Sequence, residues 1–415
     1  MSETVHIPQL RFPEFNGGWK ESRIGKIYKD LRTGSTPSRA VKSYFKGDNP
    51  WITSGELKYN RISTTFEQIS DEAIKDTNLV LYQPGTLFIA ITGLEAPGTR
   101  GKCAINAVPS TTNQSCLAFR KVDSVDTIYM FYWYLKYGKP LYFKYAQGTK
   151  QQSFNNKIVE KFQIFLPNKP EQQKIAAFLT AVDNKIEQLS KKQELLDEYK
   201  KGLMQQIFSQ AIRFKADDDS EFPDWEEKKL GGVVDNVGGT ALEKYTNPKE
   251  THKFISIGNY GVDGKYIDNG QRVELNNKTK TKLLDKDNLV MVLNDKTAAG
   301  NIVGSTILID ESDSYIYNQR SERLICKSEL FPIFAWHYLN SKIFRKSVYS
   351  ISQGGTQIYV NFPSVKELNF SLPSLLEQTK IAIFLSSIDT KIEQVGKQLD
   401  ESKQFKKALL QQMFI

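Results

Sequence analysis

Residues 166–208 read LPNKPEQQKIAAFLTAVDNKIEQLSKKQELLDEYKKGLMQQIF, and residues 372–414 read LPSLLEQTKIAIFLSSIDTKIEQVGKQLDESKQFKKALLQQMF. The two stretches are offset by 206 residues, and about half of their positions are identical without a gap. The same offset pairs Trp19 with Trp225 near the start of each half. Self-similarity of this kind means that the chain contains one structural unit twice.

Each of these stretches is predicted to form one long helix. The first has no proline after Pro170, and Glu171 suits the positive end of the helix dipole. Apolar residues recur at alternating steps of four and three over five heptads, which is typical of a coiled coil rather than of an ordinary amphipathic helix. The predicted seam residues are Ile175, Leu179, Val182, Ile186, Leu189, Leu196 and Leu203 in the first helix, and Ile381, Leu385, Ile388, Ile392, Val395, Leu399 and Leu409 in the second.

The connection between the halves predicts how these helices pair. Only the short segment 210–224 separates the first helix from the second strand-rich region, so the second helix must run back along the first. The expected fold class is therefore α/β (α+β), with two strand-rich domains separated by an antiparallel two-helix coiled coil and related by a pseudo-twofold internal repeat. Lys200 and Lys406 occupy equivalent seam positions, where they either set the helix register or mark a surface that a partner covers.

The repeat also predicts the domain boundaries. Between the repeated anchors, residues 32–130 and 238–335 share only short islands, which indicates one scaffold that presents two different surfaces. The predicted boundaries are an N-terminal segment that packs near the C-terminus (1–18), a first strand-rich domain (19–165), a first helix (166–209), a linker (210–224), a second strand-rich domain (225–372) and a second helix (373–415).

The charge distribution favours an anionic partner. The net charge is +9, and residues 19–165 carry 21 Lys and Arg against 12 Asp and Glu. Residues 225–371 carry 19 against 17, whereas the helical stretches are close to neutral. The positive field therefore belongs to the strand-rich regions, as expected of a nucleic-acid-binding protein.

Glycine-rich polar loops follow the predicted buried strands 85–91 and 287–293. Glycine allows close backbone approach, while Lys and Arg reach phosphates and Gln offers paired contacts to adenine. Each loop taken alone is more often a solvated turn than a DNA-reading element. The residues predicted to contact nucleic acid are Arg100, Lys102, Lys150, Gln151, Lys296, Asn301 and Gln357.

The sequence predicts no catalytic or metal site. At all five Gly-Lys pairs the earlier glycine of a phosphate-binding Walker loop is missing. No Asn/Asp-Pro-Pro-Tyr/Phe tetrapeptide of an amino-methyltransferase is present, and the three histidines are isolated from the three cysteines. The odd, scattered cysteines, and the lack of a secretory signal or of an apolar run long enough to span a membrane, predict a cytoplasmic protein.

Several motifs together resemble the specificity subunits of type I restriction-modification systems. The stretches Gly34-Ser-Thr-Pro-Ser38 and Gly47-Asp-Asn-Pro-Trp-Ile-Thr-Ser-Gly-Glu-Leu57 are similar to the opening of that family's target-recognition domain. Arg11-Phe-Pro and Glu221-Phe-Pro-Asp-Trp225 resemble its repeat openings. The second half lacks the Thr-Pro-Ser and Pro-Trp-Ile elements, so its loops are expected to differ in detail.

The resemblance implies a DNA-binding subunit without catalytic activity. Each strand-rich domain would read one half of a bipartite, asymmetric DNA sequence, and the helices would bind two methyltransferase subunits, which restriction/translocase subunits join. The methyl donor, ATP and Mg would then be used by those partners. The alternative is a structural coiled-coil adaptor that links two protein-binding domains. The salt dependence of binding distinguishes the DNA-binding subunit from the adaptor, because phosphate contacts make affinity fall steeply as the salt concentration rises.

Overall fold

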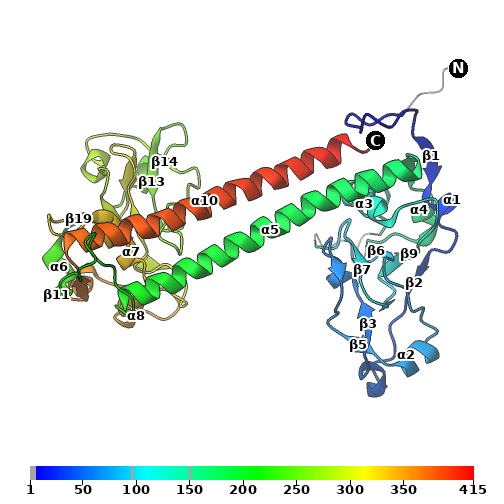
Figure 1. Ribbon diagram of the computed structural model, residues 1–415, viewed down its shortest axis with the longest axis horizontal. Coiled ribbons are helices and arrows are strands. Elements are labelled where there is room, and N and C mark those ends of the chain that lie inside the picture. Colours follow the sequence, from blue (N-terminus) through cyan, green and yellow to red (C-terminus); the bar gives the residue numbers. More distant parts are fainter. Residues whose placement is uncertain (1–5, 95–97, 149–151) are drawn as a thin grey trace. The chain divides into compact units, whose positions relative to one another are not determined.

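The computed structural model describes residues 6–94, 98–148 and 152–415. It divides into two compact units (Figure 1), unit 1 with Met1–Ser190 and Lys397–Ile415, and unit 2 with Lys191–Gly396. The predicted boundaries set the helices apart from the strand-rich domains. In the structure each unit instead includes the part of helices α5 (Lys169–Phe208) and α10 (Leu375–Gln412) that packs against its own strands.

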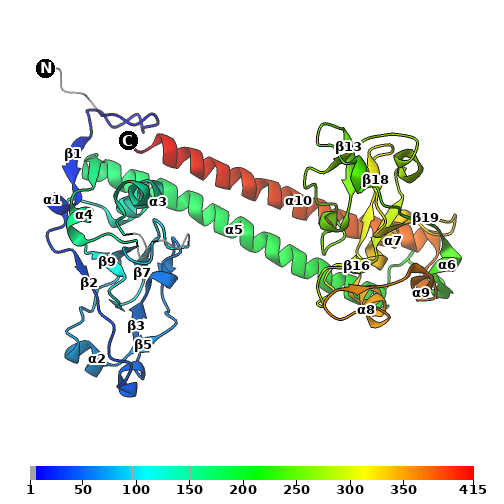
Figure 2. The same ribbon diagram turned by 180° about the vertical axis from the view of Figure 1, so that it is seen from behind.

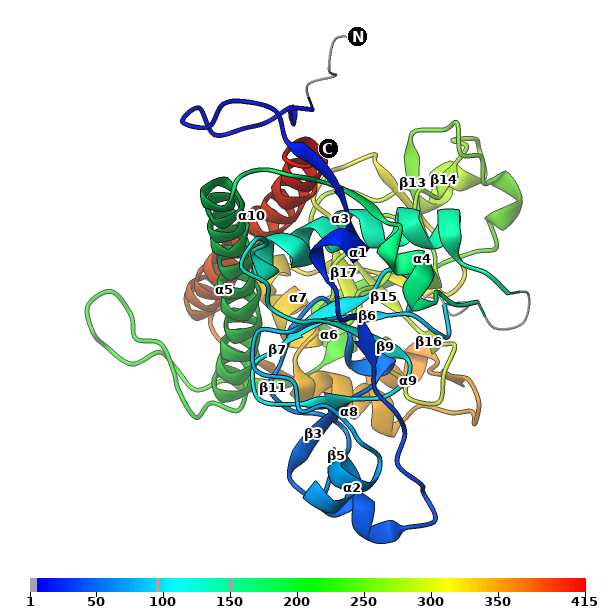
Figure 3. The same ribbon diagram turned by 90° about the vertical axis from the view of Figure 1, so that its right-hand side faces the viewer.

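Unit 1 is built on a five-stranded sheet with the order β2–β9–β6–β7–β4, and a second sheet has the order β5–β3–β8. Helix α3 contacts β6 and β7 and covers one side of the larger sheet (Figure 3). The elements are β1 (Lys20–Arg23), α1 (Ile24–Ile27), β2 (Arg32–Thr33), β3 (Asn49–Ile52), β4 (Arg61–Ile62), β5 (Gln68–Ile69), α2 (Asp71–Asp76), β6 (Leu87–Ala90), β7 (Cys103–Asn106), β8 (Thr111–Thr112), β9 (Cys116–Phe119), α3 (Thr127–Tyr145), α4 (Asn156–Glu160) and β10 (Gln163–Leu166).

Unit 2 repeats this construction with a four-stranded sheet, β12–β19–β15–β17, and a smaller one, β14–β13–β18. The elements are β11 (Glu226–Lys229), α6 (Leu230–Val233), β12 (Val234–Gly238), β13 (His252–Ile255), β14 (Arg272–Val273), β15 (Leu289–Val292), β16 (Asn294–Asp295), β17 (Thr306–Leu308), β18 (Tyr315–Tyr317), β19 (Ser321–Cys326), α7 (Pro332–Leu339), α8 (Lys342–Ser350), β20 (Ile358–Tyr359), α9 (Phe362–Lys366) and β21 (Asn369–Leu372).

The core of each unit lies under its central strand. Every residue of β6 and of β15 is buried, as the continuous apolar runs 85–91 and 287–293 predict for strands covered on both faces. The register of the outer strand pair is also repeated. Lys20 pairs with Leu166 in unit 1, and Glu226 pairs with Leu372 in unit 2, at the same offset as the sequence repeat.

A buried carboxylate anchors the start of each long helix. Glu171 is fully buried and accepts hydrogen bonds from Arg11 Nε and Nη2, both at 2.7 Å, and from Trp19 Nε1 at 3.2 Å. In unit 2, Glu377 accepts from Arg213 at 2.8 Å and from Trp225 at 3.1 Å. A buried carboxylate needs hydrogen-bond donors or a charged partner. Here the arginine and tryptophan that supply them come from segments far from the helix in sequence.

The structure changes one motif comparison. The sequence comparison matched Glu221-Phe-Pro with Arg11-Phe-Pro as the two repeat openings. In the structure the counterpart of Arg11 is Arg213, because Arg11 binds Glu171 and Arg213 binds the equivalent Glu377. The Phe12 ring packs 5.6 Å from that of Phe178, and the Phe214 ring packs 5.4 Å from that of its repeat counterpart, Phe384. The N-terminal segment also reaches the end of α10, because Leu10 N donates to Gln412 O at 2.9 Å.

The paired helices bury their predicted seam within each unit. The seam residues are buried except for four half-buried ones, Val182, Ile186, Leu196 and Leu203. In unit 2, Lys200 lies opposite Asp389 at 2.7 Å, while a Cβ at Gly396 would lie 3.1 Å from Gln193 Nε2. Residue numbers that rise along one helix as they fall along the other mean that the helices are antiparallel there.

The two polar seam residues find partners on the opposite helix. Lys200 binds both oxygens of Asp389, and in unit 1 Lys406 binds Asp183, the repeat counterpart of Asp389. This pairing favours the first of the two explanations that the sequence left open, in which the lysines set the register of the helices. Within the described part of the chain, none of the helices combines the length and apolar character that a membrane span requires.

Candidate nucleic-acid interface

Two loops of unit 2 that are distant in sequence lie side by side. Strand β16 pairs antiparallel with β20, with Asp295 opposite Ile358. This pairing brings Lys296 and Asn301, which follow β16 (labelled in Figure 2), close to Gln357, which precedes β20. All three side chains are exposed, so the structure places these predicted residues on one edge of unit 2.

Asp295 holds the first of these loops in shape. It is only 5% exposed, and its Oδ1 accepts hydrogen bonds from the amide and the hydroxyl of Thr297, both at 2.9 Å. Its Oδ2 accepts from Ile302 N at 2.8 Å. Burial opposes ionisation of Asp295, but the hydrogen bonds from Ile302 and Thr297 outweigh it, so its pKa is lowered. The ionised carboxylate thus preorganises the loop between these residues.

Helix α8 supports the same loop from the other side. Arg345 donates from Nε to Val303 O at 2.9 Å and from Nη2 to Asn301 O at 2.8 Å. Burial lowers the pKa of Arg345 to about 10, which leaves it charged at neutral pH. Gly300 has a φ of +63°, and a Cβ there would lie 2.6 Å from the Tyr349 ring, so only glycine fits against α8.

The exposed side of α8 adds basic and aromatic groups to this edge. Lys342, Lys346 and Tyr349 are exposed at helical spacing, and Tyr349 donates to Ala298 O of the loop at 3.4 Å. Tyr359, on β20, is 45% exposed. Sequence reasoning missed these residues because it took its candidate contacts from the glycine-rich loops and not from the helices. The spacing of 342, 346 and 349 was the available signal.

Unit 1 joins its two loops in the same way. Leu94 N donates to Gln152 O at 3.0 Å, and Gln147 forms a bridge with Ser153, as Gln353 does with Tyr359 in unit 2. The predicted residues Lys150 and Gln151 lie outside the described residues. The construction of the loop edge therefore belongs to the repeated scaffold, whereas the side chains on it differ.

Arg100 and Lys102 are less available than the sequence suggests. Both are half-buried, and Arg100 donates from Nε to Leu94 O at 2.9 Å with its guanidinium 4.8 Å from the centre of the Tyr142 ring. Lys102 Nζ lies 4.2 Å from the centre of the Tyr59 ring. These contacts hold the loop against the unit, as cation–π pairs commonly do.

Other groups of unit 1 are fully presented on helix α3. Lys139 and Phe143 are exposed one helical turn apart, Lys144 is exposed beside them, and Phe143 is 68% accessible. Basic side chains next to an exposed aromatic ring match the edge formed by α8 in unit 2. Each unit therefore offers cations for phosphates together with loops that carry amide side chains, which is the combination used for reading DNA.

Alanine at Lys342 and Lys346 together should weaken binding to duplex DNA without unfolding unit 2. Each lysine that contacts a phosphate releases counterions, so the slope of log affinity against log salt should fall by about one per residue removed. The matched control is Lys286→Ala, an exposed lysine before β15 and thus at the opposite end of that strand from β16. An unchanged slope in the double variant would remove α8 from the interface.

The described residues contain no group of three or more His, Cys, Asp or Glu arranged to hold a metal ion. Cys103 and Cys116 are fully buried, and burial raises the pKa of each thiol, to about 12 for Cys116. A thiol with a raised pKa is a poor nucleophile.

Comparisons with known proteins identify the family of this chain. The family described as "Type I restriction modification DNA specificity domain" matches residues 16–197 and again residues 223–401, once in each half. The type I restriction enzyme MjaVIII specificity subunit of Methanocaldococcus jannaschii is 28% identical over 412 residues, which is 97% of this chain and 92% of that protein. The MjaIX specificity subunit of the same organism is 31% identical over 245 residues, 54% of this chain and 56% of that protein.

Solved structures show the same fold. The crystal structure of the type I restriction-modification S subunit from M. genitalium superimposes with a TM-score of 0.60 at 17% identity, over 99% of both chains. A structure titled for complex assembly and conformational transition of the type I R-M system has a TM-score of 0.55 at 15% identity, over 97% of this chain and 98% of that one. The chain therefore belongs to the family of type I restriction-modification DNA specificity subunits and is a non-catalytic, DNA-recognising subunit.

Proposed function

We propose that each unit reads one half of a bipartite, asymmetric DNA site. The observation that carries this proposal is the repeated loop edge. Both units join two loops beside a basic, aromatic helix, but the side chains differ, with Lys296, Asn301 and Gln357 on one edge and Lys139 and Phe143 on the other. Two units with the same backbone construction but different side chains at the loop edge suit a DNA site whose two halves differ in sequence.

The same chain acts as the scaffold of a larger complex in this proposal. Two methyltransferase subunits bind along the paired helices, and restriction/translocase subunits join them on cytoplasmic DNA. The methyl donor, ATP and Mg are used by those subunits. Supporting this proposal, one solved relative is titled for assembly of the type I R-M system.

Methylome sequencing tests this function directly. A host strain carrying the partner methyltransferase should show methylation at one split, asymmetric motif only when this subunit is also present. The same strain without this subunit is the control. An identical methylome in both strains would contradict the proposal, whereas methylation of an unsplit palindrome would leave DNA recognition in place and overturn its bipartite form.

A further inference from the structure

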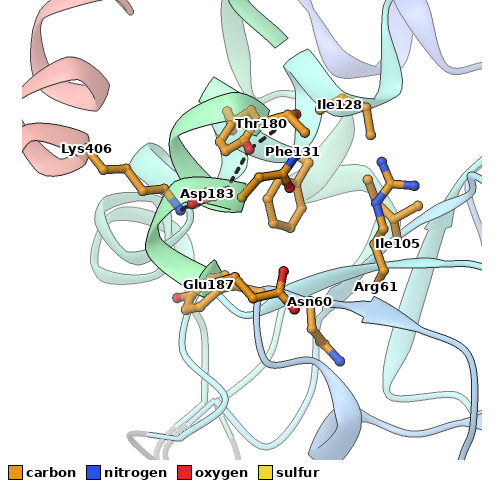
Figure 4. Close-up of a pocket in the computed structure, with 12 residues that line it drawn as sticks. Asn60, Arg61, Ile105, Ile128, Phe131, Thr180, Asp183, Glu187 and Lys406 are labelled. Carbon is orange, nitrogen blue, oxygen red and sulfur yellow. Dashed lines mark hydrogen bonds and ion pairs between the residues drawn. The ribbon is translucent and has the colours of Figure 1, made fainter. Parts of the chain in front are cut away.

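Unit 1 contains an open cavity of about 560 Å³ between its larger sheet and helix α5. Figure 4 shows the residues that line it, with Asp183 and Glu187 of α5 on one wall and Arg61 of β4 on another. Ile128 and Phe131 of α3 close the apolar end. The cavity thus has an acidic wall, a basic wall and an apolar end.

One of the two acids on the α5 wall lacks a partner. Asp183 accepts a hydrogen bond from Tyr132 Oη at 2.7 Å and pairs with Lys406. Glu187 lies one helical turn further along and is exposed. Among residues 6–94, 98–148 and 152–415, none forms an ion pair or a side-chain hydrogen bond with Glu187, and Arg61 does not pair with either acid.

In unit 2 the equivalent pair of acids is bound by a lysine of the chain itself. In unit 2 the counterparts of Asp183 and Glu187 are Asp389 and Glu393, at the 206-residue offset. Lys265 reaches both, with Nζ at 2.9 Å from Glu393 and 3.9 Å from Asp389. Partial burial opposes the charge of Lys265, but Glu393 and Asp389 outweigh it, and the pKa of Lys265 is raised.

A tight turn delivers Lys265 to this site. Gly261 N donates to Lys265 O at 2.9 Å, and Gly264 O accepts from Trp336 Nε1 of helix α7 at 3.0 Å. Trp336 corresponds to Phe131, because equivalent hydrogen bonds start both helices, from Asp126 N to Gln172 and from Phe331 N to Gln378. The turn therefore packs on the residue whose counterpart lines the cavity of unit 1.

The corresponding segment of unit 1 takes another course. Both segments begin with the same capping box, Thr53 with Glu56 and Ser256 with Asn259. After it, unit 1 continues into strand β4, where Arg61 pairs with Ile105 of β7. The strand pairing keeps this backbone on the sheet instead of letting it turn over α5, so the space filled by the Gly261–Lys265 turn in unit 2 stays open in unit 1.

We propose that the unit 1 cavity receives a lysine or arginine from a turn of a partner protein, in the place that Lys265 fills in unit 2. This inference rests on the proposed function, since the partner is a methyltransferase subunit of the same complex. The acidic wall matches a basic side chain, and the cavity has room for a turn as well as for the side chain. The site in unit 2 is thus completed by the chain itself, and the site in unit 1 by a partner.

The test uses the full-length chain and its cognate methyltransferase subunit, titrated by calorimetry at two salt concentrations. Glu187→Gln should weaken the binding of one methyltransferase subunit about tenfold at low salt, and less at high salt, because it removes a charge from the contact. The melting temperature of the free chain should not change, since Glu187 forms no ion pair or side-chain hydrogen bond within the described part of the chain. The matched variant is Glu393→Gln, which should leave the affinity intact because Lys265 already occupies that site.

The outcomes separate this inference from the proposed function. If the unmodified chain binds no methyltransferase subunit, the proposed scaffold function fails. If the subunit binds equally well to the unmodified chain and to Glu187→Gln, only the docking site is wrong. Arg61→Gln provides a second check. If it and Glu187→Gln lower the melting temperature equally and neither changes the affinity, Arg61 itself is the cation for Glu187 and the proposal is overturned.

Discussion

Exchange of residues 238–371 for the same region of a relative with a different target should change one half of the methylated motif completely and leave the other half as it was. The exchanged region holds all the unit 2 loop residues, including Lys296, Asn301 and Gln357. The groups that join unit 2 to its helices, Trp225 and Glu377, lie outside it. The new loops should therefore be presented by an unchanged frame.

The size of this effect follows from the energetics of base reading. Each mismatched base pair costs about 1–3 kcal/mol, so a new set of loop side chains moves recognition from one sequence to another instead of merely weakening it. The measurement is methylome sequencing of the exchanged variant beside the parent. Exchange of residues 32–165, the counterpart of 238–371 at the 206-residue offset, is the reciprocal control and should change the other half. A change in both halves from either exchange would contradict independent reading by the two units.

Replacement of Glu171 by alanine should destabilise unit 1 by about 3 kcal/mol, because removing one member of a buried ion pair leaves the other charge uncompensated. Arg11 is 13% exposed at its side chain and would lose both hydrogen bonds to the carboxylate. Trp19 would lose its indole hydrogen bond at the same time. The start of α5 and the N-terminal segment should detach together.

Amide hydrogen exchange separates the two units, which need not unfold together in a chain of this size. Strand β6 should exchange more than a hundredfold faster in Glu171→Ala, since 1.4 kcal/mol corresponds to a factor of ten, while β15 keeps its protection. Glu377→Ala should give the opposite pattern. The control Glu14→Ala removes a surface pair with Lys174, exposed by 47% and 53%, and should change neither strand. Equal loss of protection in β6 and β15 from Glu171→Ala would contradict a local anchor.

The repeated helices were predictable because their evidence is local and periodic. Apolar seam residues in each long helix recur about every 3.5 residues, a pattern that is typical of paired helices. The buried strands β6 and β15 were predictable for the same reason, since a short apolar run bounded by turns has few alternatives. The family motifs predicted the function of the chain, but they did not predict which side chains contact one another.

The candidate DNA contacts were less predictable, because exposure depends on neighbours that are remote in sequence. Arg100 is a basic residue in a glycine-rich loop, yet its guanidinium packs against Tyr142. Lys346 was not among the predicted contacts, yet it is exposed on the helix whose Arg345 supports the loop. Nothing within a few residues of either position distinguishes a side chain that reaches outward from one that folds back.

The amino-acid sequence by itself determined that this protein is one unit repeated, that two long helices carry an apolar seam, and that the two halves present different loops, since periodicity and self-similarity are properties of the chain alone. Only the tertiary structure decided which charges meet. Lys265 reaches Asp389 and Glu393 while Glu187 faces an open cavity, although the acids are identical in both repeats. The physical reason is that an ion pair needs a separation of a few ångströms, and backbone courses such as strand β4 in one unit and a tight turn in the other set that separation.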